Sequence, residues 1–310
     1  MANTELISRE DVVAQWNRYV QSTVQLAWTR FSRFPPNSGP SLAESLGIKP
    51  GERILEIGSG LGIFSSRLNN SNIPVTIVGI EPNEAYLDYE LPDCLQATNR
   101  VSEVCGDGFT LPFTADSFDR VIAHAVVTLF PEREWQNLPE EVKRILDKDG
   151  CVSHLDNINN ESWYPEYLRL TGTDRRTQFE SLLEETHENL QTGYAQDAHD
   201  LTEQLENVGF NPTTVDTYSK VLRLSESRWE DRQVRELLTL RHRAELDRLS
   251  RFTNLLEALN RNKPDTMELL DRCREDFDQL HERRLRAFQD DRELGWDSCT
   301  TLVVTGEFSP

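Results

Sequence analysis

The sequence passes from an apolar run into a glycine-rich turn at Ile54-Leu55-Glu56-Ile57-Gly58-Ser59-Gly60-Leu61-Gly62. The apolar residues predict a buried strand over 53–57, and the spacing after the turn predicts a helix over 63–68. Glycines allow the backbone to turn sharply and to approach a ligand closely. A dinucleotide site has GxGxxG spacing, whereas this turn reads GxGxG. The carboxylate of Glu56 would repel a pyrophosphate and suit a ligand with an ammonium group.

The same strand–helix alternation continues outward from this turn. Further strands are predicted over 75–80, 101–105, 118–126 and 151–155, one more within 212–224, and one over 299–308. Helices are predicted between them, including helices over 131–146, 162–188 and 201–208. Short apolar strands alternating with helices are typical of a parallel sheet covered on both faces. A helix with Ser8 at its N-cap is predicted to end near Phe31, before the Pro- and Gly-rich stretch 34–40. The fold class is therefore α/β, with a doubly wound sheet.

Two further segments contain residues that could bind a ligand. Gly79-Ile80-Glu81-Pro82-Asn83 places an acid at the end of the second strand, where a carboxylate can accept both hydroxyls of a ribose. A second segment runs from Gly106-Asp107-Gly108-Phe109 through Leu111-Pro112-Phe113 to Asp116-Ser117-Phe118-Asp119. We expect Asp119 to be structural, Phe109 and Phe113 either to stack near a base or to pack in the core, and Cys105 to be a small buried hydrophobe.

Together these motifs resemble the class I S-adenosylmethionine-dependent methyltransferases, whose first motif is (D/E)xGxGxG. The lead-in Leu46-Gly47-Ile48-Lys49-Pro50-Gly51 and the segment Trp16-Asn17-Arg18-Tyr19 are also similar. The resemblance covers residues 46–157 and implies a seven-stranded Rossmann-like methyltransferase sheet with helical insertions. It implies that S-adenosyl-L-methionine is bound, with Asp107 on the adenine amino group and the Gly108 N–H on a ring nitrogen. The full set of implied cofactor-binding residues is Glu56, Gly58, Ser59, Gly60, Gly62, Glu81, Pro82, Asp107, Gly108, Phe109 and Ala123.

Ligands of open α/β sheets lie beyond the carboxyl ends of the strands, so residues that end the fourth and fifth strands are the catalytic candidates. His124 is one, either as a general base or as a group that only packs on the cofactor. Asp156 is the other, positioned to hold a substrate amine or hydroxyl, while His154 is expected to face the flank of the sheet. No GxSxG elbow is present, so a Ser-His-Asp triad is not supported, and no metal site is expected.

Four parts of the chain are expected: an N-terminal helical cap (1–45), a cofactor-binding domain (46–222 plus 294–310), a helical insertion over the pocket (158–200), and a helical hairpin (223–293). Trp163, Tyr164, Tyr167 and Phe179 could line an apolar pocket or form the insertion's own core. The hairpin could be a second roof over the pocket or a dimer surface.

The composition limits the kinds of partner that this chain can bind. The chain has 53 acidic and 33 basic residues, a formal net charge of −20, which argues against binding to nucleic acid or anionic lipid. The five cysteines lack CxxC spacing, the N-terminus does not read as a signal peptide, and no apolar run is long enough to span a membrane, so we expect a cytoplasmic protein. Residues 223–293 carry 17 acidic and 16 basic residues, so this nearly neutral hairpin could be a homodimer surface.

The function predicted from these residues is in-line methyl transfer to a small-molecule acceptor, and the 106–122 segment resembles quinone- and sterol-type members of the family. Two alternatives stay open. One is a protein methyltransferase that uses the helical hairpin as a docking surface, and the other is a non-catalytic interaction protein with a vestigial cofactor site.

Overall fold

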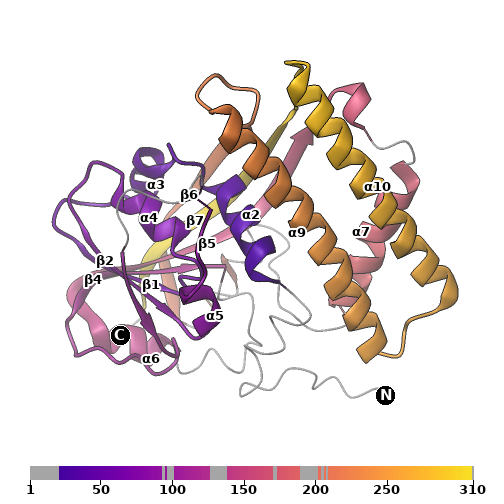
Figure 1. The fold of residues 1–310 in the computed structure, drawn as a ribbon. Coiled ribbons are helices and arrows are strands. Elements are labelled where there is room, and N and C mark those ends of the chain that lie inside the picture. The colour runs from indigo at the N-terminus through magenta and orange to yellow at the C-terminus, as the bar shows by residue number, and fades with distance from the viewer. Residues whose placement is uncertain are drawn as a thin grey trace.

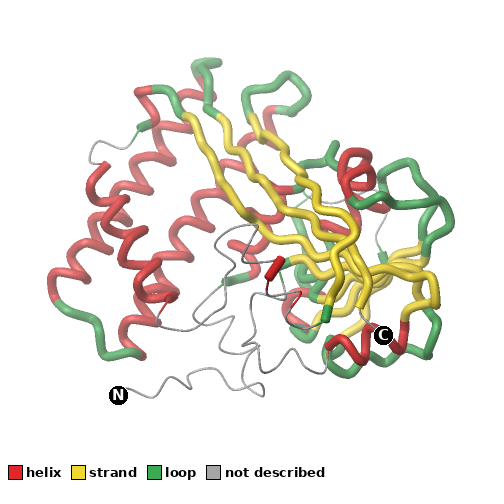
Figure 2. The backbone as a smooth tube through the Cα atoms, turned by 180° about the vertical axis from the view of Figure 1, so that it is seen from behind, coloured by secondary structure: helices red, strands yellow, loops and turns green. Residues whose placement is uncertain are grey.

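The computed structural model describes residues 21–92, 95, 101–125, 138–169, 173–188, 202–203, 206 and 209–308. Its strands form a sheet in the order β3-β2-β1-β4-β5-β7-β6 (Figures 1 and 2). The strands are β1 (Arg53–Ile57), β2 (Thr76–Glu81), β3 (Ser102–Cys105), β4 (Phe118–His124), β5 (Leu146–Trp163), β6 (Phe210–Arg223) and β7 (Trp296–Phe308). The doubly wound α/β fold predicted from the sequence is confirmed.

The sheet is parallel from β3 to β5, as the alternation over 51–157 predicts. Ile57 pairs with Ile80 and with Ala123, so the carboxyl ends of β2, β1 and β4 lie at one edge. Strand β7 runs antiparallel to both β5 and β6. Two antiparallel helices connect β6 to β7, and they return the chain to the end of the sheet from which it left, so β7 must run the opposite way.

Strand β5 is longer than predicted. A helix was expected from residue 162, but β5 continues to Trp163 and α7 begins only at Thr173. The polar stretch 157–163 has no strand-like alternation, and its pairing with β7, which reaches Trp163 opposite Trp296, holds it extended. Figure 2 shows the three long strands β5, β7 and β6 running side by side toward the helical part of the molecule. Residues 158–163 of the predicted insertion are therefore strand.

Helices cover both faces of the sheet. On one face, α2 (Thr23–Arg33), α3 (Gly39–Ser45) and α4 (Ile63–Asn69) bury their apolar side chains against β1, β4 and β6. On the other, α6 (Leu138–Ile145) contributes Val142 and Ile145 to a cluster with Val121 and Val152. The smaller helical elements are α5 (Glu84–Leu87) and η5 (Glu166–Leu168). Cys105 is exposed rather than buried, because β3 is the edge strand of the sheet.

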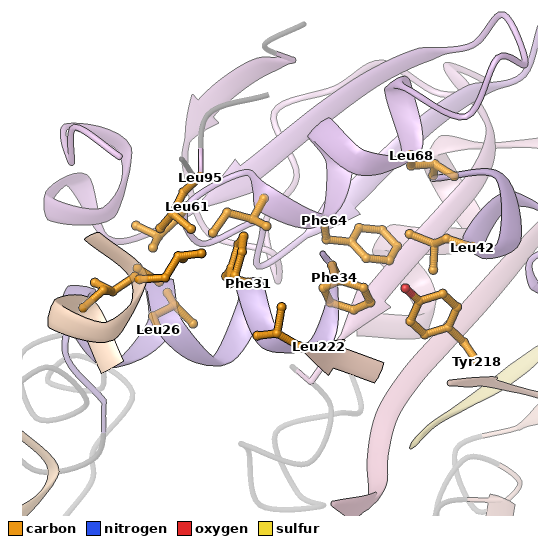
Figure 3. Packing of buried hydrophobic residues seen from close by; sticks show 14 of the residues in the cluster. Leu26, Phe31, Phe34, Leu42, Leu61, Phe64, Leu68, Leu95, Tyr218 and Leu222 are labelled. Carbon is orange, nitrogen blue, oxygen red and sulfur yellow. The ribbon is translucent and has the colours of Figure 1, made fainter. Parts of the chain in front are cut away.

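A row of buried residues packs helix α2 against the sheet (Figure 3). Phe31 and Phe34 are both fully buried, which stabilises the fold by roughly 1.5–3 kcal/mol for each side chain. The Phe34 ring lies edge-on to Phe64 of α4 at 5.2 Å between centroids, and it also contacts Tyr218 of β6. These contacts fix where the last turn of α2 lies over the sheet.

The region 223–293 folds as two long helices, α9 (Asp231–Ala258) and α10 (Pro264–Gln289), which lie side by side next to α7 (Thr173–Glu188) in Figure 1. Phe179 of α7 is fully buried in a cluster with Phe252 of α9 and Phe277 of α10. Phe179 therefore packs in a buried core, as one of the two alternatives predicts, but this core is shared with the helical hairpin. Trp163 is 42% exposed, so it does not belong to a buried core of the insertion.

A buried ionic cluster joins this helical region to the sheet. Arg241 of α9 donates to Asp297 of β7 at 2.7 Å and also to the Tyr164 hydroxyl. Arg284 of α10 donates to both oxygens of Glu245 at 3.0 Å. Because buried charges need partners, these contacts fix the hairpin against β5 and β7.

Several sequence predictions lie outside the described residues. They are the helix start at Ser8, the Trp16–Tyr19 segment, the first part of the helix predicted over 131–146, and most of the helix predicted over 201–208.

Candidate functional site

The glycine-rich turn follows β1 and lies against the end of β2. Gly58, Gly60 and Gly62 have φ values of 71°, 59° and 66°, a region that favours glycine. The N–H groups of Gly58 and Ser59 donate to the carbonyl of Ile80 at 2.8 and 3.1 Å. A β-carbon on Gly79 would lie 2.7 Å from the Ser59 β-carbon, so only glycine there lets the turn sit this close to β2.

Glu81 ends β2 and connects it to the turn. Its Oε2 accepts from the Gly60 N–H at 2.9 Å, and its Oε1 accepts from the Asn83 N–H at 3.0 Å. Burial raises the pKa of this carboxyl to about 7, although the two backbone donors favour its charged form. Each oxygen keeps a second lone pair, so Glu81 can still accept from a ligand hydroxyl. Pro82, the next residue, is exposed.

Glu56 lies beneath the turn and is almost completely buried. The Ser65 hydroxyl of α4 donates to its Oε2. Burial raises the pKa of Glu56 to about 8, while Ser65 and the nearby Arg30 act in the opposite direction. A carboxyl this enclosed gains most from a nearby cation, which agrees with the sequence argument for a cationic ligand.

Asp107, Gly108 and Phe109 follow β3 and cross toward the end of β1. Asp107 is exposed, and its Oδ1 accepts from the Phe109 N–H at 2.9 Å. A β-carbon on Gly108 would lie 2.7 Å from the Ile57 side chain, so this loop approaches β1 closely. Phe109 is only 9% exposed and packs with Ile57 and Ile80. The packing role left open for Phe109 is thus the one that the structure shows.

His124 is buried at the end of β4, between Phe34 and Phe64. Arg33 Nη1 lies 2.8 Å from His124 Nε2. Because a guanidinium has no acceptor, Nε2 must accept this bond and the proton of the neutral ring is on Nδ1. Burial lowers the pKa of His124 well below its usual value, and Arg30 and Arg33 add to this effect. Both observations favour a neutral His124 that orients Arg33.

Ala123 and Asp156 lie level with the carboxyl end of β4, although Asp156 does not end the fifth strand as the sequence predicts, because β5 continues to Trp163. Ala123 pairs with Ile57 and with His154, and Asp156 lies two residues after His154 on β5. Asp156 is 7% exposed, and its Oδ1 accepts from the Asn157 N–H at 2.7 Å. His154 faces the flank of the sheet against Phe210, and burial lowers its pKa to about 3.

The sequence analysis missed Arg30 and Arg33, which belong to the last turn of α2. Arg30 interacts electrostatically with Glu56 and Asp156, and burial lowers its pKa to about 10. The available signal was their spacing, since residues three apart share a helix face. A basic last turn is also expected from the helix dipole alone, so the signal was not specific. Within the described residues, no cluster of His, Cys, Asp and Glu could hold a metal ion.

The comparisons with known proteins agree with this geometry. Residues 54–150 match the family model described as a methyltransferase domain, which takes in the glycine-rich turn, Glu81, Asp107 and His124. This chain contains a class I methyltransferase domain. The family is the one whose motifs the sequence resembles, and the match ends at residue 150, within β5.

Related proteins share this methyltransferase region. The chain is 31% identical over 112 residues to protein-L-isoaspartate O-methyltransferase 2 of Rhodopseudomonas palustris, which covers 36% of this chain and 47% of the relative. It is 33% identical over 82 residues to erythromycin 3''-O-methyltransferase of Saccharopolyspora erythraea, a match that covers 26% of this chain and 27% of the relative. The chain thus spans less than half the length of the curated relatives it matches.

A solved structure confirms the fold. A proposed type II methyltransferase from Anaeromyxobacter dehalogenans superposes with a TM-score of 0.52 at 13% identity, over 90% of this chain and 98% of that chain. At this identity the likeness concerns the methyltransferase fold alone. Among the described residues, no helix is long and apolar enough to cross a membrane.

Proposed function

We propose that the chain transfers the methyl group of S-adenosylmethionine to a small-molecule acceptor at the carboxyl ends of β1, β2 and β4. One observation carries this proposal. The glycine-rich turn, the Glu81 carboxylate and the Asp107–Gly108 loop meet at one edge of the sheet, with Gly60 bonded directly to Glu81. This is where open α/β sheets bind their ligands.

The residues present fit this cofactor. The close approaches at Gly79 and Gly108 leave backbone rather than side chain next to the turn. Glu81 would accept from the ribose hydroxyls, and Asp107 with the Gly108 N–H would hold the adenine. Gly58, Ser59, Gly60 and Gly62 would bring the backbone against the methionine part, with the Ala123 carbonyl opposite and Glu56 beneath. Pro82 and Phe109 would shape the walls of the site.

The cofactor supplies an electrophilic methyl group, and this chain's residues align the acceptor with it and exclude water. Asp156 is the candidate for holding an amine or hydroxyl of the acceptor, because it follows Leu155, which pairs with His124 at the carboxyl end of β4. His124 was also a candidate general base. The Arg33 bond to its Nε2 supports a positioning role instead.

Two other proposals remain beside this one. A protein acceptor is favoured by the relative named as a protein-L-isoaspartate O-methyltransferase. A homodimer through α9 and α10 is favoured by the nearly neutral charge of 223–293 on an acidic chain. The dimer is tested by analytical ultracentrifugation, where a purely monomeric species would contradict it.

The acceptor class is tested with S-adenosylmethionine that carries a radiolabelled methyl group. The protein is incubated with a cell extract that ultrafiltration has divided into small molecules and macromolecules. We expect label in the small-molecule fraction, together with release of S-adenosylhomocysteine. Label in the protein fraction alone would favour the protein acceptor, and the absence of any transfer would favour the non-catalytic interpretation.

A further inference from the structure

Two arginines of α2, Arg30 and Arg33, lie beside the proposed methyl-transfer edge, and neither has a carboxylate oxygen within 4 Å in the described part of the chain. Arg33 bonds through Nη1 to the neutral His124, so its positive charge is not compensated by that contact. Its Nε is enclosed and has no hydrogen-bond partner among the described residues. An enclosed charged donor without an acceptor is unfavourable, and a bound anion would remove that penalty.

The geometry of Arg33 suits an acidic group. The Nε and Nη2 groups of a guanidinium point in parallel along one edge, where they can donate together to two oxygens of a carboxylate or phosphate. His124 occupies Nη1 and leaves this edge to other partners. The ring is itself held between Phe34 and Phe64, at 4.9 and 5.5 Å between centroids. His124 therefore gives Arg33 a fixed orientation.

Arg30 strengthens the positive field at this place. Arg33 helps to lower the pKa of Arg30, which shows that the two guanidinium groups repel each other. Glu56 and Asp156 compensate Arg30 in part, whereas His124 adds no charge next to Arg33. An anion near Arg33 would relieve the repulsion between the two arginines.

We propose that Arg33 binds a carboxylate or phosphate group of the methyl acceptor, so that the substrate is an acidic small molecule. This inference rests on the proposed methyl transfer to a small molecule. It assigns to Arg33 the positioning of the acceptor and to His124 the orientation of Arg33.

The position of Arg33 along α2 favours the acceptor over the carboxylate of the cofactor. Leu26 is the residue of α2 that lies against the glycine-rich turn, 3.2 Å from where a β-carbon on Gly60 would be. Arg33 is seven residues farther along the helix, a rise of about 10 Å, and it lies at the end of β4. The cofactor's methionine part is expected at the turn, and it is Arg30, not Arg33, that interacts electrostatically with Glu56 beneath this turn.

The test uses fluorine NMR on the full chain saturated with S-adenosylhomocysteine. The probes are 4-fluorobenzoate and 4-fluorophenyl phosphate, and the neutral control is 4-fluorobenzamide. We expect the wild type to bind at least one acidic probe about tenfold more tightly than the amide, a difference that Arg33→Gln removes. Arg33→Lys should keep part of this preference, because lysine keeps the positive charge but lacks the two parallel N–H donors of the guanidinium. The acidic probe that binds more tightly distinguishes a carboxylate substrate from a phosphate substrate.

Arg286→Gln is the matched control, because it removes an arginine that is largely exposed on α10. It should bind all probes as the wild type does. Calorimetry on Arg33→Gln should give an S-adenosylhomocysteine affinity within about twofold of the wild type, which also shows that the variant is folded. A tenfold loss of that affinity would overturn the inference and make Arg33 a cofactor residue.

The inference is also overturned if the wild type binds S-adenosylhomocysteine but does not prefer either acidic probe, a result that leaves the proposed methyl transfer standing. If the wild type does not bind S-adenosylhomocysteine, the proposed function itself is wrong.

Discussion

The N–H of Gly60 donates to Oε2 of Glu81 at 2.9 Å, and this bond joins the glycine-rich turn to the end of β2. The two residues are far apart in sequence and belong to different motifs. Their contact means that the turn and the proposed ribose-binding carboxylate form one rigid unit. A change at either residue is therefore expected to affect the binding of the cofactor as a whole.

The conformation of Gly60 gives the first prediction. Gly60→Ala should weaken S-adenosylhomocysteine binding by at least about tenfold and destabilise the fold by about 1–2 kcal/mol, because alanine is strained at a φ of 59° and its β-carbon would crowd Leu26. Calorimetry and urea unfolding measure the two effects. Gly47→Ala is the control, since Gly47 has a φ of 62° with open space around it. Equal loss of binding in both variants would contradict this account.

The raised pKa of Glu81 gives the second prediction. With a pKa of about 7 in the free protein, Glu81 is largely protonated below neutral pH. A diol binds best to the charged carboxylate, so S-adenosylhomocysteine affinity should rise as the pH increases through about 7. Titrations at several pH values check this, and in Glu81→Gln the rise should be much smaller. A rise that persists unchanged in Glu81→Gln would assign it to another group, such as Glu56.

The buried ionic cluster gives the third prediction. Asp297→Asn should destabilise the protein by about 2–4 kcal/mol, because Arg241 would keep its charge in a largely buried site with only the more distant Glu245 carboxylate, at 3.4 Å, as partner. Glu282→Gln is the matched control, because Glu282 and its ion-pair partner Arg286 are both exposed. This variant should change the free energy of unfolding by less than about 0.5 kcal/mol. Urea unfolding of both variants measures the difference. Equal stabilities would show that the Asp297 contact does not hold the hairpin.

His154 gives the fourth prediction, which concerns acid stability. Its pKa is about 3 in the folded protein and about 6.5 when unfolded, so the unfolded state binds the extra proton as the pH falls below about 6.5. This group therefore destabilises the fold by about 2 kcal/mol at pH 5, at 1.36 kcal/mol per pKa unit. His154→Leu should reduce the loss of stability between pH 7 and pH 5 by about that amount. An unchanged loss would place the acid sensitivity elsewhere.

Much of the proposed site could be predicted because its residues follow apolar strands directly. Glu56, Glu81 and Asp107 each lie at or just after a strand whose apolar run marks its end, and parallel strands bring those ends to one edge. The helical hairpin could be predicted for a similar reason, since its apolar positions recur at helical spacing over two long segments.

The missed features depend on contacts between distant segments. Arg33 reaches His124 only because Phe31 and Phe34 fix how α2 crosses the sheet, and helical periodicity does not contain that information. The extension of β5 through residue 163 is held by its pairing with β7, since the stretch itself is polar. Tertiary pairing overrides local propensity in such strands.

The central claim is that this chain binds S-adenosylmethionine at the Gly60–Glu81 unit, and calorimetric titration tests it most directly. At about pH 8, where Glu81 is charged, the wild type should bind S-adenosylmethionine at one site, and Glu81→Ala should weaken that binding by at least about tenfold. Glu84→Gln, which changes an exposed acid three residues away, should leave it unchanged. An absence of binding heat in the wild type, or equal affinities of the wild type and Glu81→Ala, would contradict the account.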